Sequence, residues 1–358
     1  MLNILLTAIP ILALLIVVFL SINFKKKDSS DLLDLNQTSF LKALSCIIIV
    51  YVHIPEMFSN KLQDLIGSFA GVGVMLFFLF SSFGTLTQYN KNKNISFFVT
   101  FWIKRLTALF ITALIINLIN FVWCGVDGSG WSVINIVRFN RYIYAILAGY
   151  LIIFIALITD FVLKSKNSLI VYICLACVLF ASSIVTFFTK FDIFQLWAVE
   201  SLGLTIGVIM FVLKPQIECV LSKTKPYVIT LCALCVVAGS SSLVYLLKKD
   251  DGFLMAFVIR GIMFWSIGSL LIAATHKIDI SKKPIHILGA ASYGVYLLHL
   301  VVIDRLLSVI PEGQSGLFIL AVFFISVGGA IAISYCVKPL NKLIRKWCKS
   351  IELALSKN

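Results

Sequence analysis

The stretch "LKALSCIIIVYVHIPEMF" (residues 41–58) is an apolar run that carries a lysine near its start and a histidine near its end. A bilayer core of about 30 Å needs roughly 20 apolar residues, so the run predicts a membrane-spanning helix. Eleven residues at 100° each make three turns plus about 20°. Lys42 and His53 should therefore share one helix face, about 16 Å apart along the axis.

Ionisable groups inside a membrane span are costly, so each is a functional-site hypothesis by default. The structural alternative for this stretch stays open. In it, Lys42 extends its ammonium to the membrane surface, and His53 bonds to a neighbouring carbonyl group.

The remainder of the chain has the same apolar character. Of 358 residues, 60% are hydrophobic and 13% are charged, whereas soluble domains carry about 25% charged residues. Backbone groups in lipid must be paired within their own segment, so we predict an all-α polytopic transmembrane bundle. Eleven candidate spans follow, at about 3–24, 39–56, 67–87, 106–123, 142–163, 168–187, 195–213, 227–247, 254–275, 285–307 and 316–337.

Lysine and arginine are concentrated in alternate connections, 21 in one set of loops and 6 in the other. Cytoplasmic loops carry this excess, which predicts an external N-terminus and a cytoplasmic C-terminus. "KKK" (25–27) directly follows the first span, so 1–24 is predicted to be an uncleaved anchor. We predict a membrane domain over 37–340 and a basic amphipathic tail over 341–358, suited to an anionic membrane surface. This topology explains the net charge of +14 without a nucleic-acid partner.

A second membrane histidine lies in "LGAASYGVYLLHLVVIDRLL" (288–307). Ser292, Tyr296 and His299 follow the spacing i, i+4, i+7, which places them in one polar stripe. The predicted topology puts His299 at a depth similar to that of His53. An interhelical hydrogen-bond stripe is the structural alternative.

Two further groups of charges are notable. Glu200 and Arg260 fall at the same outer level, where they could serve catalysis or form a structural salt bridge. A cluster at the inner level could hold phosphate groups: Lys42, Lys91, Lys93, Lys104 and Arg105. The alternative for the inner group is the ordinary excess of positive charge on the cytoplasmic side.

The nine cysteines give no metal signal. Two pairs have C-x-x-C spacing, but neither has a His, Asp or Lys neighbour. We interpret both pairs as small core residues one helical turn apart, and we expect no metal: Cys174 with Cys177, and Cys232 with Cys235.

Together, four stretches resemble the motifs of acyltransferase family 3, a family of integral membrane acyltransferases. The family has an Arg-x10-His helix, a helix like GVxxFFxxSGF, an F-x-x-R-R helix start and a late LG-x-x-SYxxYLxH motif. The corresponding stretches are "LKALSCIIIVYVH" (41–53), "GVGVMLFFLFSSFG" (71–84), "FWIKRLTAL" (101–109) and "LGAASYGVYLLH" (288–299).

The chain departs from the family pattern at several points. Lys42 replaces the usual arginine, which keeps the charge but loses bidentate geometry. A serine pair at 81–82 replaces Ser-Gly, and the Trp-Phe signature that many members show near "NRYIYAILAGYL" is absent. The family usually has ten spans, so 1–24 resembles an added helix.

The resemblance implies transfer of an acyl group, usually acetyl from acetyl-CoA, to a hydroxyl of a glycan or lipid-linked sugar. It makes the plasma membrane of a bacterium the expected location, with the donor on the cytoplasmic side. Lys42, Lys104 and Arg105 would hold the phosphates of the donor.

Within this resemblance, His53 is expected to act as general base toward the acceptor hydroxyl, because neutral imidazole predominates near pH 7 and is still basic enough. His299 would be a second base or a structural member of its stripe, and an acyl-histidine intermediate is an alternative. Glu200 could orient an imidazole. The candidates for stabilising the oxyanion are Tyr296, Ser292 and Arg260.

Two other classes of function stay open at this point. A transporter or flippase of a polysaccharide precursor would use the same intramembrane charges as a substrate pathway. A membrane scaffold without catalysis would not depend on the intramembrane histidines.

Overall fold

The computed structural model describes residues 2–19, 23–24, 31–127, 136–137, 139–163, 168–189, 197–248, 252–280 and 282–355. Lys25–Lys27, on which part of the orientation prediction depends, lie outside the described residues. So do the last three residues of the predicted tail.

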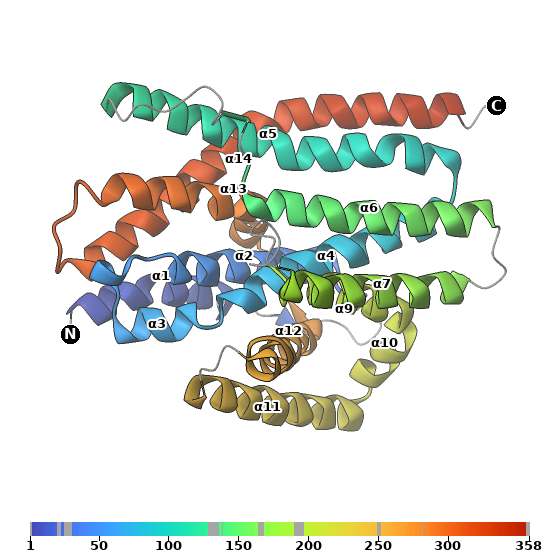
Figure 1. The fold of residues 1–358 in the computed structure, drawn as a ribbon, viewed down its shortest axis with the longest axis horizontal. Coiled ribbons are helices and arrows are strands. Elements are labelled where there is room, and N and C mark those ends of the chain that lie inside the picture. Colours follow the sequence, from blue (N-terminus) through green and yellow to red (C-terminus); the bar gives the residue numbers. More distant parts are fainter. Residues whose placement is uncertain are drawn as a thin grey trace.

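The described chain is almost entirely helical (Figure 1), which confirms the predicted all-α fold. Its longer elements are α1 (Leu2–Phe19), α2 (Leu35–Val52), α4 (Ala70–Lys91), α5 (Ile95–Asp127), α6 (Arg141–Val162), α7 (Ser168–Phe188), α9 (Leu202–Val212), α10 (Lys214–Ser222), α11 (Thr224–Leu247), α12 (Arg260–His276), α13 (Lys283–Leu306) and α14 (Ser315–Leu355). Shorter pieces are α3 (Lys61–Gly67), the 3₁₀ turn η1 (Glu56–Phe58) and the π-helical η3 (Leu254–Ile259). Strands β1 (Asn23–Phe24) and β2 (Ile278–Asp279) pair antiparallel.

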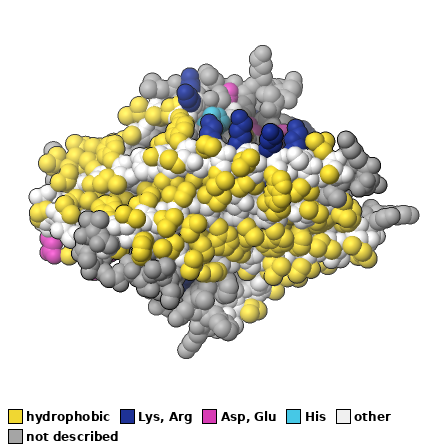
Figure 2. Space-filling model, turned by 90° about the horizontal axis from the view of Figure 1, so that it is seen from above, with side chains coloured by type: hydrophobic (Ala, Val, Ile, Leu, Met, Phe, Trp, Pro, Cys, Tyr) yellow, Lys and Arg dark blue, Asp and Glu magenta, His cyan; other side chains and the backbone are white. Residues whose placement is uncertain are grey.

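Nine helices of the described ranges are long and apolar enough to cross a membrane, and a bent pair can add a tenth crossing. α1 is a shorter apolar helix beside them. Figure 2 shows a broad apolar surface with lysine and arginine side chains gathered along one border. The chain is therefore an integral membrane protein with a polytopic helical bundle.

The predicted span 195–213 differs from the single helix expected there. Within the described residues it consists of α9, which is followed by α10 after a bend of 74°. Pro215 lies in the first turn of α10, where its missing N–H is tolerated but where it cannot continue the preceding helix. The span is consequently broken between Val212 and Lys214.

Helices α2, α4 and α13 form the centre of the bundle, and α9 and α14 pack on them. Asp34 caps α2 by accepting a hydrogen bond from the backbone of Gln37 at 2.8 Å. Gly289 of α13 lies against the backbone of Ser39, so α2 and α13 pack closely. This contact places the N-terminal halves of the two helices side by side.

The first helix is joined to the rest of the bundle by polar contacts. The Asn3 amide donates to the Gly313 carbonyl at 3.2 Å, and the Tyr51 hydroxyl donates to the Thr7 carbonyl at 2.5 Å. Asn60 donates to the Thr7 hydroxyl at 2.9 Å. The predicted anchor is thus packed against the ends of α2 and α14.

The last helix runs without interruption through residue 340, where the domain was predicted to end. Residues 339–355, from Pro339 to the end of α14, are called the C-terminal arm below. In Figure 1 the arm runs beside the beginning of α5. The predicted tail therefore packs against the helical bundle at the start of α5.

Candidate active site

Two imidazoles meet where α2 ends. His53 is the C-terminal cap residue of α2, and His299 lies on α13. Their ring centroids are 4.9 Å apart with an interplanar angle of 62°. His299 is fully buried and His53 is half-buried. The structure therefore brings together the two histidines that the sequence placed at similar depth.

Both rings use the same nitrogen to bond their own helix. Nδ1 of His53 lies 3.0 Å from the Ile49 carbonyl oxygen, and Nδ1 of His299 lies 3.0 Å from the Val295 carbonyl oxygen. A carbonyl only accepts, so each Nδ1 carries the proton and each neutral ring has its lone pair on Nε2. Among the described residues, Nε2 of His299 has no hydrogen-bond partner. In both neutral histidines Nε2 is thus the nitrogen that can accept a proton.

Aromatic rings continue from this pair into the bundle. Tyr296 lies 6.0 Å from His299 between ring centroids, and Tyr142 of α6 lies 5.1 Å from Tyr296. A small cavity lies between these two tyrosines and Tyr293. The Ser292 hydroxyl is used within its own helix, where it donates to the Gly289 carbonyl at 2.8 Å.

Glu200 and Arg260 form an ion pair. Glu200 lies in a turn before α9 and is only 3% exposed, and its Oε1 accepts from Nη2 of Arg260 at 2.6 Å. Arg260 begins α12 directly after the π-helical turn, and its guanidinium lies over the Phe264 ring at 5.0 Å. Within the described chain Oε2 of Glu200 has no partner. Glu200 is close enough to Tyr296 for an electrostatic interaction, but its direct contact is with Arg260 and not with an imidazole.

Glu200→Ala is expected to lower the free energy of unfolding by about 1–3 kcal/mol, because Arg260 loses its carboxylate partner. The partial exposure of Arg260 keeps the effect below that of a fully buried pair. Thermal unfolding of the detergent-purified protein measures it, with the exposed Glu312→Ala as control. Unchanged stability together with lost activity would contradict the structural role.

The predicted inner cations lie around the start of α5. Arg105 donates to the Thr85 hydroxyl at 2.7 Å and to the Gln88 amide oxygen at 3.3 Å, which joins α5 to α4. Lys42 is close enough to Arg105 for their charges to interact. Lys104 forms an ion pair with Glu352 of the C-terminal arm at 2.5 Å.

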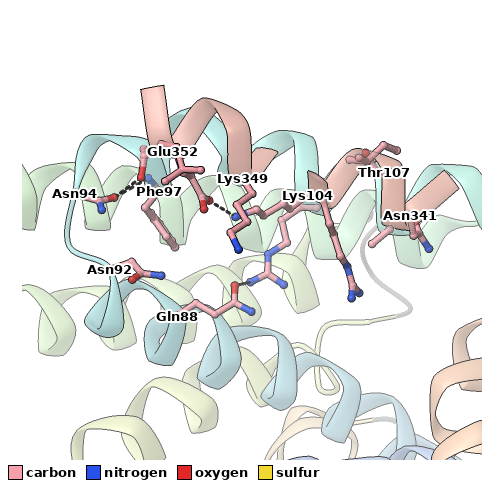
Figure 3. A pocket seen from close by; sticks show the side chains of 15 residues that line it. Gln88, Asn92, Asn94, Phe97, Lys104, Thr107, Asn341, Lys349 and Glu352 are labelled. Carbon is pink, nitrogen blue, oxygen red and sulfur yellow. Dashed lines mark hydrogen bonds and ion pairs between the residues drawn. The ribbon is translucent and has the colours of Figure 1, made fainter. Parts of the chain in front are cut away.

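A cavity of about 860 Å³ lies between the end of α4, the start of α5 and the C-terminal arm (Figure 3). Four cations line it, two from α5 and two from the arm: Lys104, Arg105, Arg345 and Lys349. Its remaining polar side chains include Gln88, Asn92 and Glu352. Lys42 does not line the cavity, but its charge interacts with that of Arg105, which does.

Sequence reasoning did not identify the arm residues as part of a site, because it assigned them to a membrane-surface tail. A signal was present in their spacing. Arg345, Lys349 and Glu352 follow i, i+4, i+7, which places them on one helix face. That face is the one that lines the cavity.

A model of acyltransferase family 3, described as an acyltransferase domain, matches residues 35–335 of this chain. Neither the curated proteins nor the solved structures gave a match. The matched region covers most of the 358 residues and includes both histidines, the Glu200–Arg260 pair and the inner cations of α2 and α5. Helix α1 and the C-terminal arm lie outside it. On this match and on the helical membrane fold, the chain belongs to acyltransferase family 3.

Proposed function

We propose that this protein transfers an acyl group, acetyl in the first instance, from acyl-CoA to a hydroxyl of a cell-surface glycan or lipid-linked saccharide. The observation that carries the proposal is the contact between His53 and His299, each with Nε2 available for a proton. Acyl transfer to a hydroxyl needs such a base. Family membership supports the reaction class.

The donor would bind in the cationic cavity at the other end of the bundle. A coenzyme A molecule carries several phosphate charges, and the cavity has space of about 860 Å³ and four cationic side chains. Arg and Lys bind phosphate through charge-assisted hydrogen bonds. Arg105 is already oriented by Thr85 and Gln88, so its guanidinium is fixed at the cavity wall.

Tyrosine side chains lie between the cationic cavity and the histidine pair. The Arg105 guanidinium lies 5.0 Å from the Tyr150 ring centroid, and Tyr293 donates to the carbonyl of Leu109, one turn beyond Arg105, at 3.1 Å. The small cavity between Tyr293, Tyr296 and Tyr142 comes next, and Tyr296 is the neighbour of His299. A thin thioester arm following these rings would reach the imidazoles, provided that the tyrosine side chains move apart.

In the chemical step, Nε2 of His53 takes the proton of the acceptor hydroxyl while the hydroxyl oxygen attacks the thioester carbonyl carbon. The new C–O bond forms, the C–S bond breaks, and His53 returns the proton to the leaving sulfur. His299 lies beside His53 and would help to position it, and the Tyr296 hydroxyl would be a donor to the developing oxyanion. Glu200 and Arg260 would hold the α9–α12 side of this region.

Reconstitution in vesicles with labelled acetyl-CoA and candidate glycans tests the proposal. Label that appears on the acceptor, and depends on His53, supports it. Substrate flux that needs no acyl donor would indicate a transporter. Insensitivity of every readout to the histidines would indicate a scaffold. The proposed orientation, with the C-terminus in the cytoplasm of a bacterial cell, is tested by cysteine labelling from each side.

Lys42→Arg is expected to keep activity, and Lys42→Ala to raise the KM for acetyl-CoA about tenfold, because a positive charge next to Arg105 would be lost. Steady-state kinetics in vesicles measures both variants. Unchanged donor affinity in Lys42→Ala would exclude a role in phosphate binding.

A further inference from the structure

The C-terminal arm forms one entire wall of the cationic cavity. Its contribution includes Asn341, Arg345, Lys349 and Glu352, and the opposite wall comes from α4 and α5. Figure 3 shows Lys349 extending from the arm toward the side where Gln88 and Asn92 lie. The family match ends at residue 335, so this wall lies outside the matched region.

One carboxylate lies among the cations of this cavity. Oε1 of Glu352 accepts from Nζ of Lys104 at 2.5 Å and from the Thr100 hydroxyl at 3.1 Å. It therefore occupies the position that an anionic ligand of Lys104 would take. Arg345 and Lys349 form no ion pair with any described residue. The arm therefore presents two cations without a carboxylate partner, next to Lys104 of α5, which is paired with Glu352.

We propose that the C-terminal arm is the second half of the donor site. Glu352 holds Lys104 until a phosphate group of the donor displaces its carboxylate, and Arg345 and Lys349 then bind the phosphates from the arm side. This inference rests on the proposed function, since it takes acyl-CoA as the ligand of the cavity. It goes beyond that function in naming an internal competitor and two phosphate-binding residues outside the region that the family model matches.

The displacement is energetically reasonable. Lys104 and Glu352 are 43% and 33% exposed, and exposed pairs contribute little stability. A phosphate offers more charge and more acceptor oxygens than a carboxylate, so it competes well for the same ammonium. Among the described residues that line the cavity, Glu352 is the only carboxylate, so its release leaves only cationic and neutral side chains there.

The chain contains its own control for the two arm cations. Lys346 lies between Arg345 and Lys349 on the same helix, is exposed, and does not line the cavity. If the arm only attracted anionic lipid, Lys346 and Lys349 would be equivalent. If the arm binds the donor, then of these two lysines only Lys349 should affect donor affinity.

The experiment is isothermal titration of the full-length, detergent-purified protein with acetyl-CoA. Glu352→Gln removes the competing charge and is expected to lower the Kd about two- to fivefold. Lys349→Ala and Arg345→Ala are each expected to raise it about tenfold. Lys346→Ala should match wild type. Inorganic pyrophosphate as a competitor should show the same order of affinities, since it carries only the phosphate chemistry.

Equal effects of Lys346→Ala and Lys349→Ala would overturn the inference, as would a Glu352→Gln variant that binds acetyl-CoA no more tightly than wild type. These outcomes are separate from failure of the proposed function. Acyl transfer that depends on His53 but ignores the arm variants would refute the arm site alone. Arm-dependent binding without any acyl transfer would refute the proposed reaction and keep the site.

Discussion

His53→Ala is expected to reduce the rate of acyl transfer about 10²–10⁴-fold, the usual contribution of a general base. The half-buried ring keeps its lone pair on Nε2 because Nδ1 bonds the Ile49 carbonyl, so its loss removes the proton acceptor. The rate is measured as transfer of labelled acetyl in vesicles. Since His53 lies far along α2 from Lys42, affinity for acetyl-CoA should change little.

Two companion variants make this result specific. His286→Ala, a half-buried histidine near the start of α13, removes an imidazole away from the pair and should keep wild-type activity. His299→Ala should also reduce the rate, because His53 then loses its aromatic neighbour at 4.9 Å. Acyl transfer by His53→Ala at the wild-type rate would refute the assignment of His53 as base.

Gly203→Ala is expected to destabilise the protein by about 1–3 kcal/mol, the usual cost of overpacking. A Cβ at this position of α9 would overlap the Met75 carbonyl oxygen of α4, and backbone cannot move aside as a flexible side chain can. A second close approach follows one turn later, where Gly207 lies against Ser82 and the Leu79 carbonyl. The double variant should therefore lose more stability than Gly203→Ala alone.

Thermal unfolding in detergent measures this effect, and Gly239→Ala is the matched control. Gly239 lies within α11, where a Cβ would meet no atom within 4 Å. The control should equal or exceed the wild-type midpoint, because alanine favours helix over glycine. Equal midpoints for Gly203→Ala and Gly239→Ala would contradict the packing of α9 on α4.

Much of the fold follows from composition and period alone. The apolar run around 41–52 is a helix as predicted, with a cap at Asp34 and its end at Val52. Local patterns were less informative where tertiary contacts override them. The 195–213 segment breaks after α9, since Pro215 cannot continue that helix, and the glycines of the same helix bring it onto α4.

The site was predicted in its parts but not in its pairings. His53 and His299 were expected at one depth, and the Glu200–Arg260 pair was one of two open alternatives. Nothing local indicated that Glu352 would lie on Lys104. The arm reads as a basic amphipathic helix, and such a pattern suits a lipid surface and a protein surface equally.

The sequence by itself determined that the chain is a helical membrane protein with ionisable groups at two levels, because the length, apolarity and charge of each segment are local properties. Only the tertiary structure decided which of those groups meet. His53 and His299 are 246 positions apart, and Lys104 and Glu352 are 248 apart. Such contacts depend on how whole helices pack and on where each one ends, and no single segment encodes either.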